Sequence, residues 1–481
     1  MDSRQRAVLL VAILASFVSF LDGSIVNVAL PAITDELGGG VVTQQWTLDA
    51  YLLTLGSLIL LAGAISDSFG RVRVLFVGLI GFGAASLACA IAPTAGFLIG
   101  ARGVQGFAAA LLVPSSLALI TSTFSGVAQA KAIGRWTAWT GVSFIAGPTL
   151  GGVLVDTIGW RWIFAINVVP ILVTLFFLRR VHDPARTSAP NRIDVVGAVL
   201  VALGLGGPVF ALIEQGRLGW DSPAVFLPLI VGLLCFAGYL VWERRAAHPM
   251  LPLELFSVRN FAFGNIATAF IYSALSLGPL VVTLFVQQVI GLSAIQAGLI
   301  SLPVALISLF VAGPIGTLAG RYGSRIFMTV GPLIATAGFL VMLTVREPFN
   351  VWLQLLPGML LFGLGLSITV SPLTAAVLGS IEPAHSGIAS AVNNAVSRVA
   401  GLIAVAFVGT IVGGQLGYDG FHRVVLVAAA LMALGAVASF IGIRRAQPTA
   451  LPTVESSPGT ASSGTGTSSA DSSAAPATGT A

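Results

Sequence analysis

Charged side chains are scarce in this sequence. Only 9% of its 481 residues are Asp, Glu, Lys or Arg, whereas 56% are hydrophobic. A typical soluble domain has about 25% charged residues, and so few charges cannot cover a soluble surface of this size. The composition therefore excludes a soluble enzyme, an intrinsically disordered chain and a nucleic-acid-binding protein, although the net charge is +5.

Cysteine is almost absent as well. Cys89 and Cys235 both lie in apolar stretches, which excludes a disulfide framework and leaves too few ligands for a zinc site. The sequence has no P-loop, HExxH or GxSxG motif. We therefore expect no catalytic residues, no metal, no cofactor and no ATP-driven pumping.

Long hydrophobic stretches dominate what is present. A helix needs about 20 apolar residues to cross a bilayer, and these stretches are continuous, whereas a membrane β-barrel would show short alternating segments. The first stretch is too long for a signal peptide and predicts a retained helix. We predict an all-α polytopic membrane protein with fourteen transmembrane helices, near 7–31, 45–66, 73–92, 96–121, 131–155, 162–180, 193–213, 224–243, 261–289, 295–319, 326–345, 350–377, 387–412 and 424–443.

The distribution of arginine predicts the orientation. With the N-terminus inside, 17 of the 23 basic residues fall in inner segments, 4 in outer segments and 2 within helices. Cytoplasmic loops are rich in Arg and Lys, so we predict that both termini are cytoplasmic and that the protein lies in the cytoplasmic (inner) membrane. Residues 446–481 consist mainly of Ala, Ser, Thr, Gly and Pro, which predicts a disordered cytoplasmic tail.

Two loops indicate an internal repeat. The segment from Gly63 to Arg73 contains Asp67, Gly70 and Arg71, and the segment from Gly316 to Arg325 has the same glycine spacing, also followed by arginine. The offset of 253 residues equals six spans plus two inserted spans, a parallel-repeat plan that many transporters use. We predict a six-helix bundle at 1–180, linkers and two inserted helices at 181–259, a second six-helix bundle at 260–445, and the tail.

The first loop has two interpretations. Its glycines permit a tight turn between helices, and Asp67 can pair with an arginine or with a helix N-terminus and so latch one conformation. The second loop has Gly320 at the corresponding position, so such a latch would exist in one half only. Alternatively, the loop only fixes the topology.

Polar residues inside predicted spans are the next candidates, because charge within the membrane is costly and usually functional. Asp22 lies near the middle of the first span, and Arg102 lies in the fourth with Gln105 on the same face. A buried carboxyl group can load and release a proton, whereas arginine stays charged. We therefore predict that Asp22, Arg102 and, in reserve, Asp49 couple protons. Alternatively, Asp22 and Arg102 form a structural ion pair and Asp49 is interfacial, while Glu214, at an outer helix end, is expected to be solvated.

The span at 131–155 contains Gly147, Pro148, Gly151 and Gly152. Proline removes a helical hydrogen bond, and glycines let a second helix approach closely, so this span is suited to conformational change. Ordinary close packing is the alternative. Sites for mixed amphipathic ligands are mostly apolar and aromatic. The candidate substrate-binding residues are Asn27, Trp46, Tyr51, Gln105, Trp139, Phe144, Phe270, Tyr272, Gln287, Asn394 and Arg398. Arg398 could instead position the second half.

Four motifs in order resemble the major facilitator superfamily, and within it the drug:proton antiporters with fourteen helices. The resemblance covers about residues 7–445 and is carried by four segments: Leu21–Ile33, Gly63–Arg73, Arg102–Gly106 and Gly147–Gly152. It departs from the family pattern where Ser68 and Val72 replace basic residues of the loop motif and where Ser143 replaces a glycine. The departures in the loop weaken its charge network, whereas the third exchanges one small residue for another.

By this resemblance, Asp22 is a candidate proton carrier that Arg102 supports, and Asp67 and Arg71 gate the inner side. The sequence thus predicts a proton-coupled antiporter that exports drug-like or other amphipathic molecules by alternating access. Export of an endogenous lipid or secreted metabolite is an alternative, and a non-transporting membrane sensor is a weaker one. The expected partners are a small-molecule substrate, protons and the lipid bilayer, with no nucleic acid and no ATP, and we expect a monomer.

Overall fold

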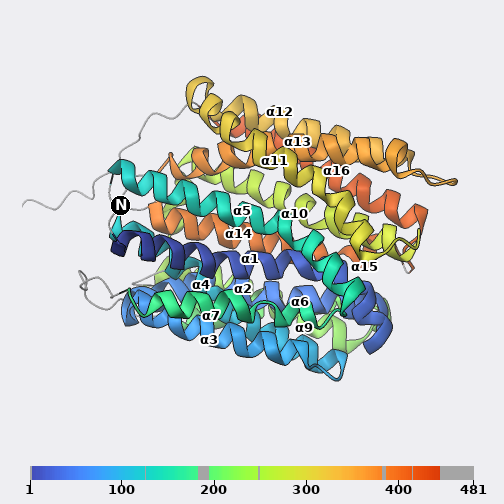
Figure 1. Cartoon of the computed structure of the whole chain (residues 1–481), viewed down its shortest axis with the longest axis horizontal. Helices are drawn as coiled ribbons and strands as arrows, with labels where there is room; N and C mark the ends of the chain where they lie inside the picture. The colour runs from blue at the N-terminus through green and yellow to red at the C-terminus, as the bar shows by residue number, and fades with distance from the viewer. Residues whose placement is uncertain are drawn as a thin grey trace, which may run out of the picture.

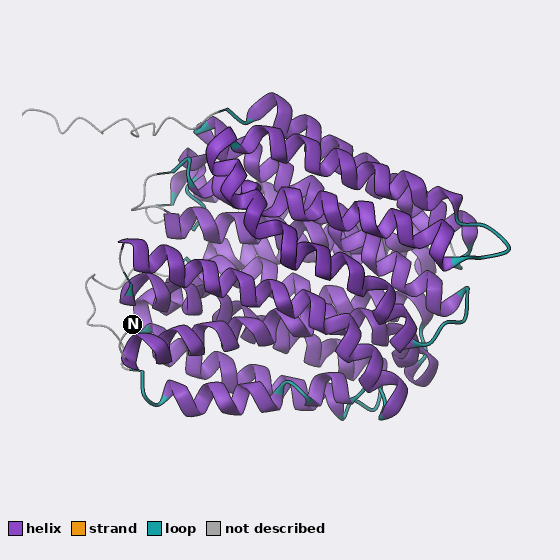
Figure 2. Ribbon diagram, turned by 45° about the horizontal axis from the view of Figure 1, so that its top comes forward, coloured by secondary structure: helices purple, strands orange, loops and turns teal. Residues whose placement is uncertain are grey.

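The computed structural model describes residues 3–124, 126–181, 194–246, 250–381, 386–413 and 415–444. Within these ranges the chain forms helices joined by short connections and contains no strand (Figure 2). The helices lie roughly side by side, and the connections gather at their two ends. The predicted tail at 446–481 and most of the linker at 181–194 lie outside the described residues.

The first half of the chain forms seven helical segments. They are α1 (Ser3–Leu37), α2 (Gly40–Phe69), α3 (Arg71–Ala90), α4 (Ala95–Thr123), α5 (Gly126–Thr157), the short α6 (Trp162–Ala165) and α7 (Val168–Leu178). Two helices follow at the position predicted for the inserted pair, α8 (Val195–Leu218) and α9 (Pro223–Arg245).

The second half begins with a short helix, η1 (Leu253–Ser257). It continues through α10 (Arg259–Gln288), α11 (Ala294–Tyr322), α12 (Ser324–Val341), η2 (Met342–Thr344), η3 (Val351–Leu355), α13 (Leu356–Leu378), α14 (Ser386–Ala406), α15 (Val408–Val412) and α16 (Tyr418–Gly442). Each predicted span therefore coincides with helical structure.

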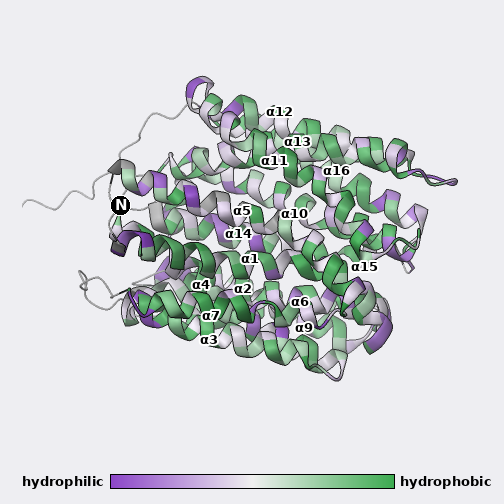
Figure 3. Ribbon diagram, in the orientation of Figure 1, coloured by the Kyte–Doolittle hydropathy of each residue, from purple (hydrophilic) through white to green (hydrophobic). Residues whose placement is uncertain are grey.

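Twelve helices in the described part of the chain are long and apolar enough to cross a membrane. Apolar residues cover the lengths of the helices, and hydrophilic residues are concentrated toward the ends of the bundle (Figure 3). The other two predicted spans contain α5, which is 32 residues long, and the shorter apolar stretch Trp162–Leu178. The molecule is therefore an all-helical, multi-pass membrane protein.

The two halves meet mainly through α1, α2 and α5 on one side and α10, α11 and α14 on the other. Figure 1 shows α12, α13 and α16 on one side, α3 and α7 on the other, and α1, α5, α10 and α14 between them. The contacts between halves are mainly α5 with α11, α2 with α14 and α1 with α10, and α8 also packs on α2, α14 and α15. Residues that α1, α2, α10 and α14 direct inward therefore lie at the boundary between the halves.

One end of the bundle holds both the first and the last described residues. Gln287 near the end of α10 donates a hydrogen bond to the carbonyl of Val28 in α1, so α1 and α10 run in the same direction. At the start of α10, Asn260 accepts a hydrogen bond from the backbone of Arg444, and Arg259 donates to carbonyls at the end of α16. The sequence predicts that this end is cytoplasmic, and we call it the inner end and the opposite one the outer end.

The backbone supports the predicted repeat. Gly70 alone separates α2 from α3, with φ 101° and ψ 130°, and Gly323 alone separates α11 from α12, with φ 93° and ψ 142°. These two glycines are 253 residues apart, the same offset that relates the two sequence motifs. Positive φ with extended ψ is essentially restricted to glycine, so each motif places its glycine where the helical turn requires it.

We expect alanine at Gly70 or at Gly323 to destabilise the protein by about 1–3 kcal/mol, because a Cβ atom is strained in this backbone conformation. Gly134 in α5 is the matched control, since a Cβ there would meet no atom within 4 Å and its φ is ordinary. Thermal unfolding of the purified variants measures the difference. Equal stability of the three alanine variants would contradict this account of the turns.

Candidate functional site

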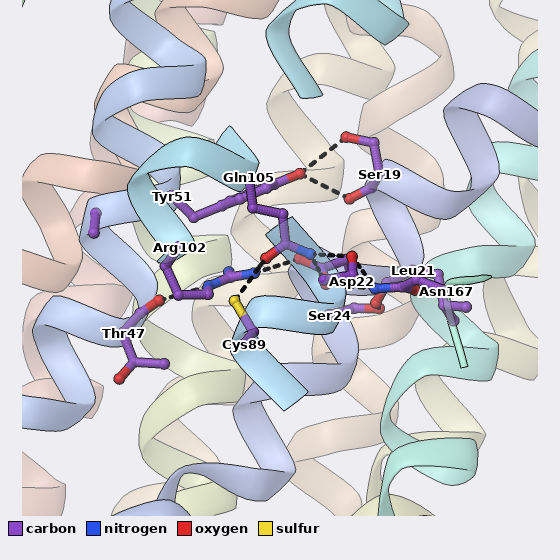
Figure 4. Close-up of polar contacts among 12 residues, drawn as sticks. Ser19, Leu21, Asp22, Ser24, Thr47, Tyr51, Cys89, Arg102, Gln105 and Asn167 are labelled. Carbon is purple, nitrogen blue, oxygen red and sulfur yellow. Dashed lines mark hydrogen bonds and ion pairs between the residues drawn. The ribbon is translucent and has the colours of Figure 1, made fainter. Parts of the chain in front are cut away.

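A buried ion pair lies near the middle of the N-terminal half. Asp22 of α1 and Arg102 of α4 are both fully buried, and Arg102 Nη1 lies 2.5 Å from Asp22 Oδ2 (Figure 4). Asp22 is about equally far from the two ends of α1, as the sequence predicts. A lone charge in such surroundings would be very costly, so each residue makes the other tolerable.

Neutral polar side chains surround the carboxylate of Asp22. Gln105 Nε2 and Asn167 Nδ2 each donate a hydrogen bond to Asp22 Oδ1, both at 2.8 Å. Gln105 also accepts from Arg102 Nη1 at 2.7 Å and donates to Ser86 Oγ at 2.9 Å. The cluster thus joins α1, α3 and α4 to the junction of α6 and α7, and it gives Asp22 three donors.

The guanidinium of Arg102 has further support. Its Nε donates to the carbonyl oxygen of Thr47 at 2.9 Å, and its central carbon lies 4.3 Å from the ring centroid of Tyr51. The ring of Phe164 lies on it at 5.7 Å. The hydroxyl of Tyr51 is hydrogen-bonded to Ser19, one turn before Asp22. Arg102 therefore keeps neutral hydrogen-bond acceptors other than Asp22.

Asn167 and Ser86 belong to the site although the sequence analysis does not select them. Asn167 occupies the break between α6 and α7, where the chain leaves regular helix before Pro170. The one sequence signal is an amide within an otherwise apolar stretch. Ser86 is a common small residue in membrane helices and carries no signal at all. The i to i+3 spacing of Arg102 and Gln105, in contrast, correctly predicts that their side chains meet.

Asp49 of α2 is also fully buried, but neither of its carboxylate oxygens has a hydrogen-bond partner among the described residues. Its neighbours at helical spacing, Trp46, Leu52 and Leu53, pack against an apolar cluster from α8 and α14. Asp49 therefore lies on the face of α2 that meets these helices, away from the ion pair. The side chain is enclosed by protein, and both the coupling role of Asp49 and the alternative of an interfacial residue stay predictions.

Glu214 of α8 differs from expectation. It is only 7% exposed. Its carboxylate accepts a hydrogen bond from Trp46 Nε1 at 2.9 Å and forms an ion pair with Arg217 at 2.8 Å. The next residue, Gln215, donates to Thr410 Oγ1 of α15 at 2.8 Å. The expected solvation fails because Trp46 of α2 covers this end of α8.

The glycines of α5 face two neighbouring helices. A Cβ atom on Gly147 or Gly151 would overlap Ser24, Ile25 or Val28 of α1, and one on Gly152 would lie 2.5 Å from the carbonyl oxygen of Ala294 in α11. Similarly, a Cβ on Gly298 of α11 would lie 2.4 Å from the carbonyl oxygen of Pro148. Backbone thus meets backbone between α5 and α11, and the proline lies within this contact between the halves.

Hydrogen bonds join the halves at the outer end. Asp156, at the end of α5, accepts from the backbone N–H groups of Ala294 and Ile295, which begin α11, at 3.2 and 2.8 Å. Gln45 of α2 donates to the carbonyls of Val405 and Ala406 in α14, both at 2.9 Å. Together with the bond from Gln287 to α1, these contacts hold the outer end closed in this structure.

The turn after α2 contacts α4. Arg71 Nη1 donates to the carbonyl oxygen of Ala118 in α4 at 3.0 Å, which ties the turn after α2 to the N-terminal half. Gly63 faces Pro114 of α4. The side chain of Asp67 lies outside the described residues, so its predicted latch stays a prediction.

The remaining candidate residues occupy different environments. Asn27, Phe270, Tyr272, Asn394 and Arg398 are half-buried on α1, α10 and α14, at the boundary between the halves. Trp139 is 54% exposed on α5, which does not support its assignment to an interior site. The side chain of Phe144 lies outside the described residues. Among the described residues, no group of three or more His, Cys, Asp or Glu side chains could hold a metal ion.

Comparison with known proteins agrees with this architecture. A family model described as the Major Facilitator Superfamily matches residues 12–405. The chain belongs to the major facilitator superfamily. This facilitator is 33% identical over 417 residues to the puromycin resistance protein of Streptomyces alboniger, covering 85% of this chain and 82% of that protein. It is thus a multi-pass membrane transporter rather than an enzyme.

Other similar proteins have related names. A multidrug resistance protein of Mycobacterium tuberculosis is 32% identical, covering 86% of this facilitator and 77% of that protein, and a methylenomycin A resistance protein of Bacillus subtilis is 32% identical over 84% and 87%. A D-xylose–proton symporter structure matches with a TM-score of 0.67 at 16% identity, covering 92% of this chain and 99% of that one. This likeness to the symporter shows the fold.

We expect Arg102→Met to reduce the free energy of unfolding by about 3–5 kcal/mol, because it leaves the carboxylate of Asp22 buried without its cation. The double variant Asp22→Asn/Arg102→Met should lose less, since no net charge remains buried. Unfolding of the purified proteins in mixed micelles measures both values. Arg161→Met is the control, because its ion pair with Glu36 is exposed and should contribute less than about 1 kcal/mol. Additive losses at Asp22 and Arg102 would contradict the pairing.

Proposed function

We propose that this facilitator is a drug:proton antiporter with fourteen transmembrane helices and both termini in the cytoplasm. It exports amphipathic small molecules across the cytoplasmic membrane by alternating access. The printed names of its relatives include puromycin, methylenomycin A and multidrug resistance, which supports an export role. The four sequence motifs and the arginine distribution support the antiporter family and the orientation.

The observation that carries this proposal is the buried, titratable centre at Asp22. Arg102, Gln105 and Asn167 all donate to its carboxylate. Protonation of Asp22 removes its attraction for Arg102, which retains the oxygens of Gln105 and Thr47 as acceptors. These neutral acceptors keep Arg102 hydrogen-bonded when Asp22 is protonated, although its charge then loses its counter-ion in the cluster.

The location of Asp22 connects this change to the boundary between the halves. Two residues later, Ser24 Oγ donates to the carbonyl oxygen of Ser143 in α5 at 3.1 Å, and Val28 accepts from Gln287 of α10. A small rotation or shift of α1 therefore acts on α5 and α10 directly. We propose that proton binding at Asp22 changes the packing of α1 against these two helices.

Proton entry supplies enough energy for export. One proton crossing 100 mV yields about 2.3 kcal/mol, and one pH unit adds about 1.4 kcal/mol. Together these support a roughly 500-fold concentration ratio of a neutral substrate. One coupling carboxylate per cycle is therefore sufficient.

We predict that Asp22→Asn abolishes uphill, proton-driven export while the protein still reaches the membrane. Asparagine has a similar size and retains hydrogen-bonding groups, but it cannot titrate. The measurement is substrate movement in proteoliposomes under an imposed pH gradient, with puromycin and methylenomycin A as the first compounds. Asp221→Asn removes an exposed carboxylate and serves as the control.

Asp49→Asn tests the reserve candidate in the same assay. A charged carboxylate without partners in an apolar cluster costs several kcal/mol, so we propose that Asp49 is neutral in this state and takes part in a second protonation step. Accumulation of substrate against its gradient by Asp22→Asn would make Asp22 structural, and loss in Asp49→Asn alone would transfer the coupling role to Asp49.

Export of an endogenous lipid or secreted metabolite is the second candidate function. It uses the same coupling and differs only in the substrate. Growth of deletion and overexpression strains across a panel of compounds separates the two, because a drug exporter shifts tolerance to added compounds. The weaker sensor alternative requires that loss of Asp22 leave function unchanged.

We predict that Asp156→Asn opens the outer end more often, because the neutral amide loses its favourable interaction with the N-terminus of α11. Loss of a charge at a helix N-terminus costs about 0.3–1 kcal/mol, which is up to about a fivefold change in population. In a background with both native cysteines replaced, Leu284→Cys at the outer end should react faster with an impermeant thiol reagent. Glu36→Gln, which breaks an outer-end ion pair within the N-terminal half, should leave the rate unchanged. Similar reaction rates in both variants would contradict the role of Asp156 in holding the outer end closed.

A further inference from the structure

Arg398 lies at the boundary between the halves. It is on α14, and a Cβ atom built on Gly56 of α2 would lie 3.4 Å from the Cβ of Arg398. Its guanidinium carbon lies 4.8 Å from the ring centroid of Phe20 in α1. Tyr51 of α2 and Tyr272 of α10 are close enough to interact with it electrostatically. Residues from three further helices thus surround one cation near the middle of the bundle.

This cation has no counter-ion among the described residues. In the described part of the chain, Arg398 forms no ion pair and no side-chain hydrogen bond, whereas Arg102 has both. The ion pair of Asp22 with Arg102 is neutral as a whole and does not compensate a third charge. Arginine stays ionised under any physiological condition. The boundary between the halves therefore holds one uncompensated positive charge.

The surroundings of Arg398 fit a ligand better than a structural role. Intramembrane arginines normally pair with a carboxylate or with backbone carbonyls, yet this side chain bonds to neither among the described residues. It is half-buried rather than sealed, as are Phe20, Tyr272 and Asn394. Asn394, one turn earlier on α14, donates only to the carbonyl of its own helix, at Ser390. The guanidinium of Arg398 therefore keeps its N–H donors available at the boundary between the halves.

We propose that Arg398 binds a carboxylate on the transported molecule and that the rings of Phe20 and Tyr272 contact an adjoining aromatic group. The planar guanidinium matches a carboxylate with two parallel hydrogen bonds. The inference rests on the proposed export function and adds aromatic acids as one substrate class that this site would recognise. Binding of the acid neutralises the charge between the halves, so the loaded protein has no net charge to desolvate there when the halves move.

Binding to the full-length protein in lipid nanodiscs tests the proposal without any gradient. Dansylglycine carries a carboxylate beside an aromatic group, and dansylglycinamide is its neutral counterpart. The wild-type protein should bind dansylglycine about tenfold more tightly, because a charge-assisted pair contributes at least that much. Arg398→Gln should remove this preference by weakening only dansylglycine binding, and Arg398→Lys should restore part of it. Arg325→Gln, which removes an exposed arginine at the inner end, should retain the wild-type preference.

Other outcomes overturn the proposal. Equal affinities of the wild-type protein for the two probes would exclude recognition of the acid, and equal losses for both probes in Arg398→Gln would indicate that Arg398 only holds the second half in place. If Arg398→Gln does not fold, competition on the wild-type protein decides: benzoate should displace dansylglycine and benzamide should not. Binding needs no proton gradient. The binding result can therefore be interpreted even if proton-coupled export is not found, and the two proposals can fail separately.

Discussion

The structure of the N-terminal half depends on one constraint, namely that a carboxylate and a guanidinium lie together where no water can solvate them. Neither charge is tolerable alone in that environment, so Asp22 and Arg102 fix the register of α1 against α4. Gln105 and Ser86 add further hydrogen bonds because buried polar groups need partners, whereas Asn167 donates to Asp22 and its own Oδ1 has no partner among the described residues. The cation–π contact with Tyr51 then brings α2 into the same arrangement.

The contacts between the halves are of a different kind. They consist of glycine backbone against backbone, as between Gly152 and Ala294, and of side-chain bonds to main-chain groups, as from Gln45 to α14. An apolar cluster also crosses the outer end, where Leu30 and Leu48 lie in one core with Leu280 and Leu284 of α10, so separating the halves there exposes large side chains. The N-terminal half therefore has a buried charge pair inside it, whereas its junction with the other half is held by close backbone approach, a shared apolar cluster and a few hydrogen bonds.

Much of the fold could be predicted from local patterns. Each predicted span contains helix, because a continuous apolar stretch in a membrane has few alternatives, and Gly70 and Gly323 have related conformations because the turn demands glycine. The site could be predicted only where its members are close in sequence, as with Arg102 and Gln105. Asn167 and Ser86 come from separate helices, and single amides and serines are not distinctive. Likewise, nothing local in the sequence indicates that Trp46 covers Glu214, more than 160 residues away.

The inserted helices are connected to both halves by adjacent residues. Glu214 bonds to Trp46 of the first half, and Gln215 bonds to Thr410 of the second. If the halves separate at this end, one of the two bonds must break. The Glu214 bond is charged and partly buried, whereas the Gln215 bond is neutral and exposed to competition from water, so the latter yields first. The inserted helices would therefore stay attached to the N-terminal half when the halves separate. Their lipid-facing surface would make that half the larger of the two bodies that move within the bilayer.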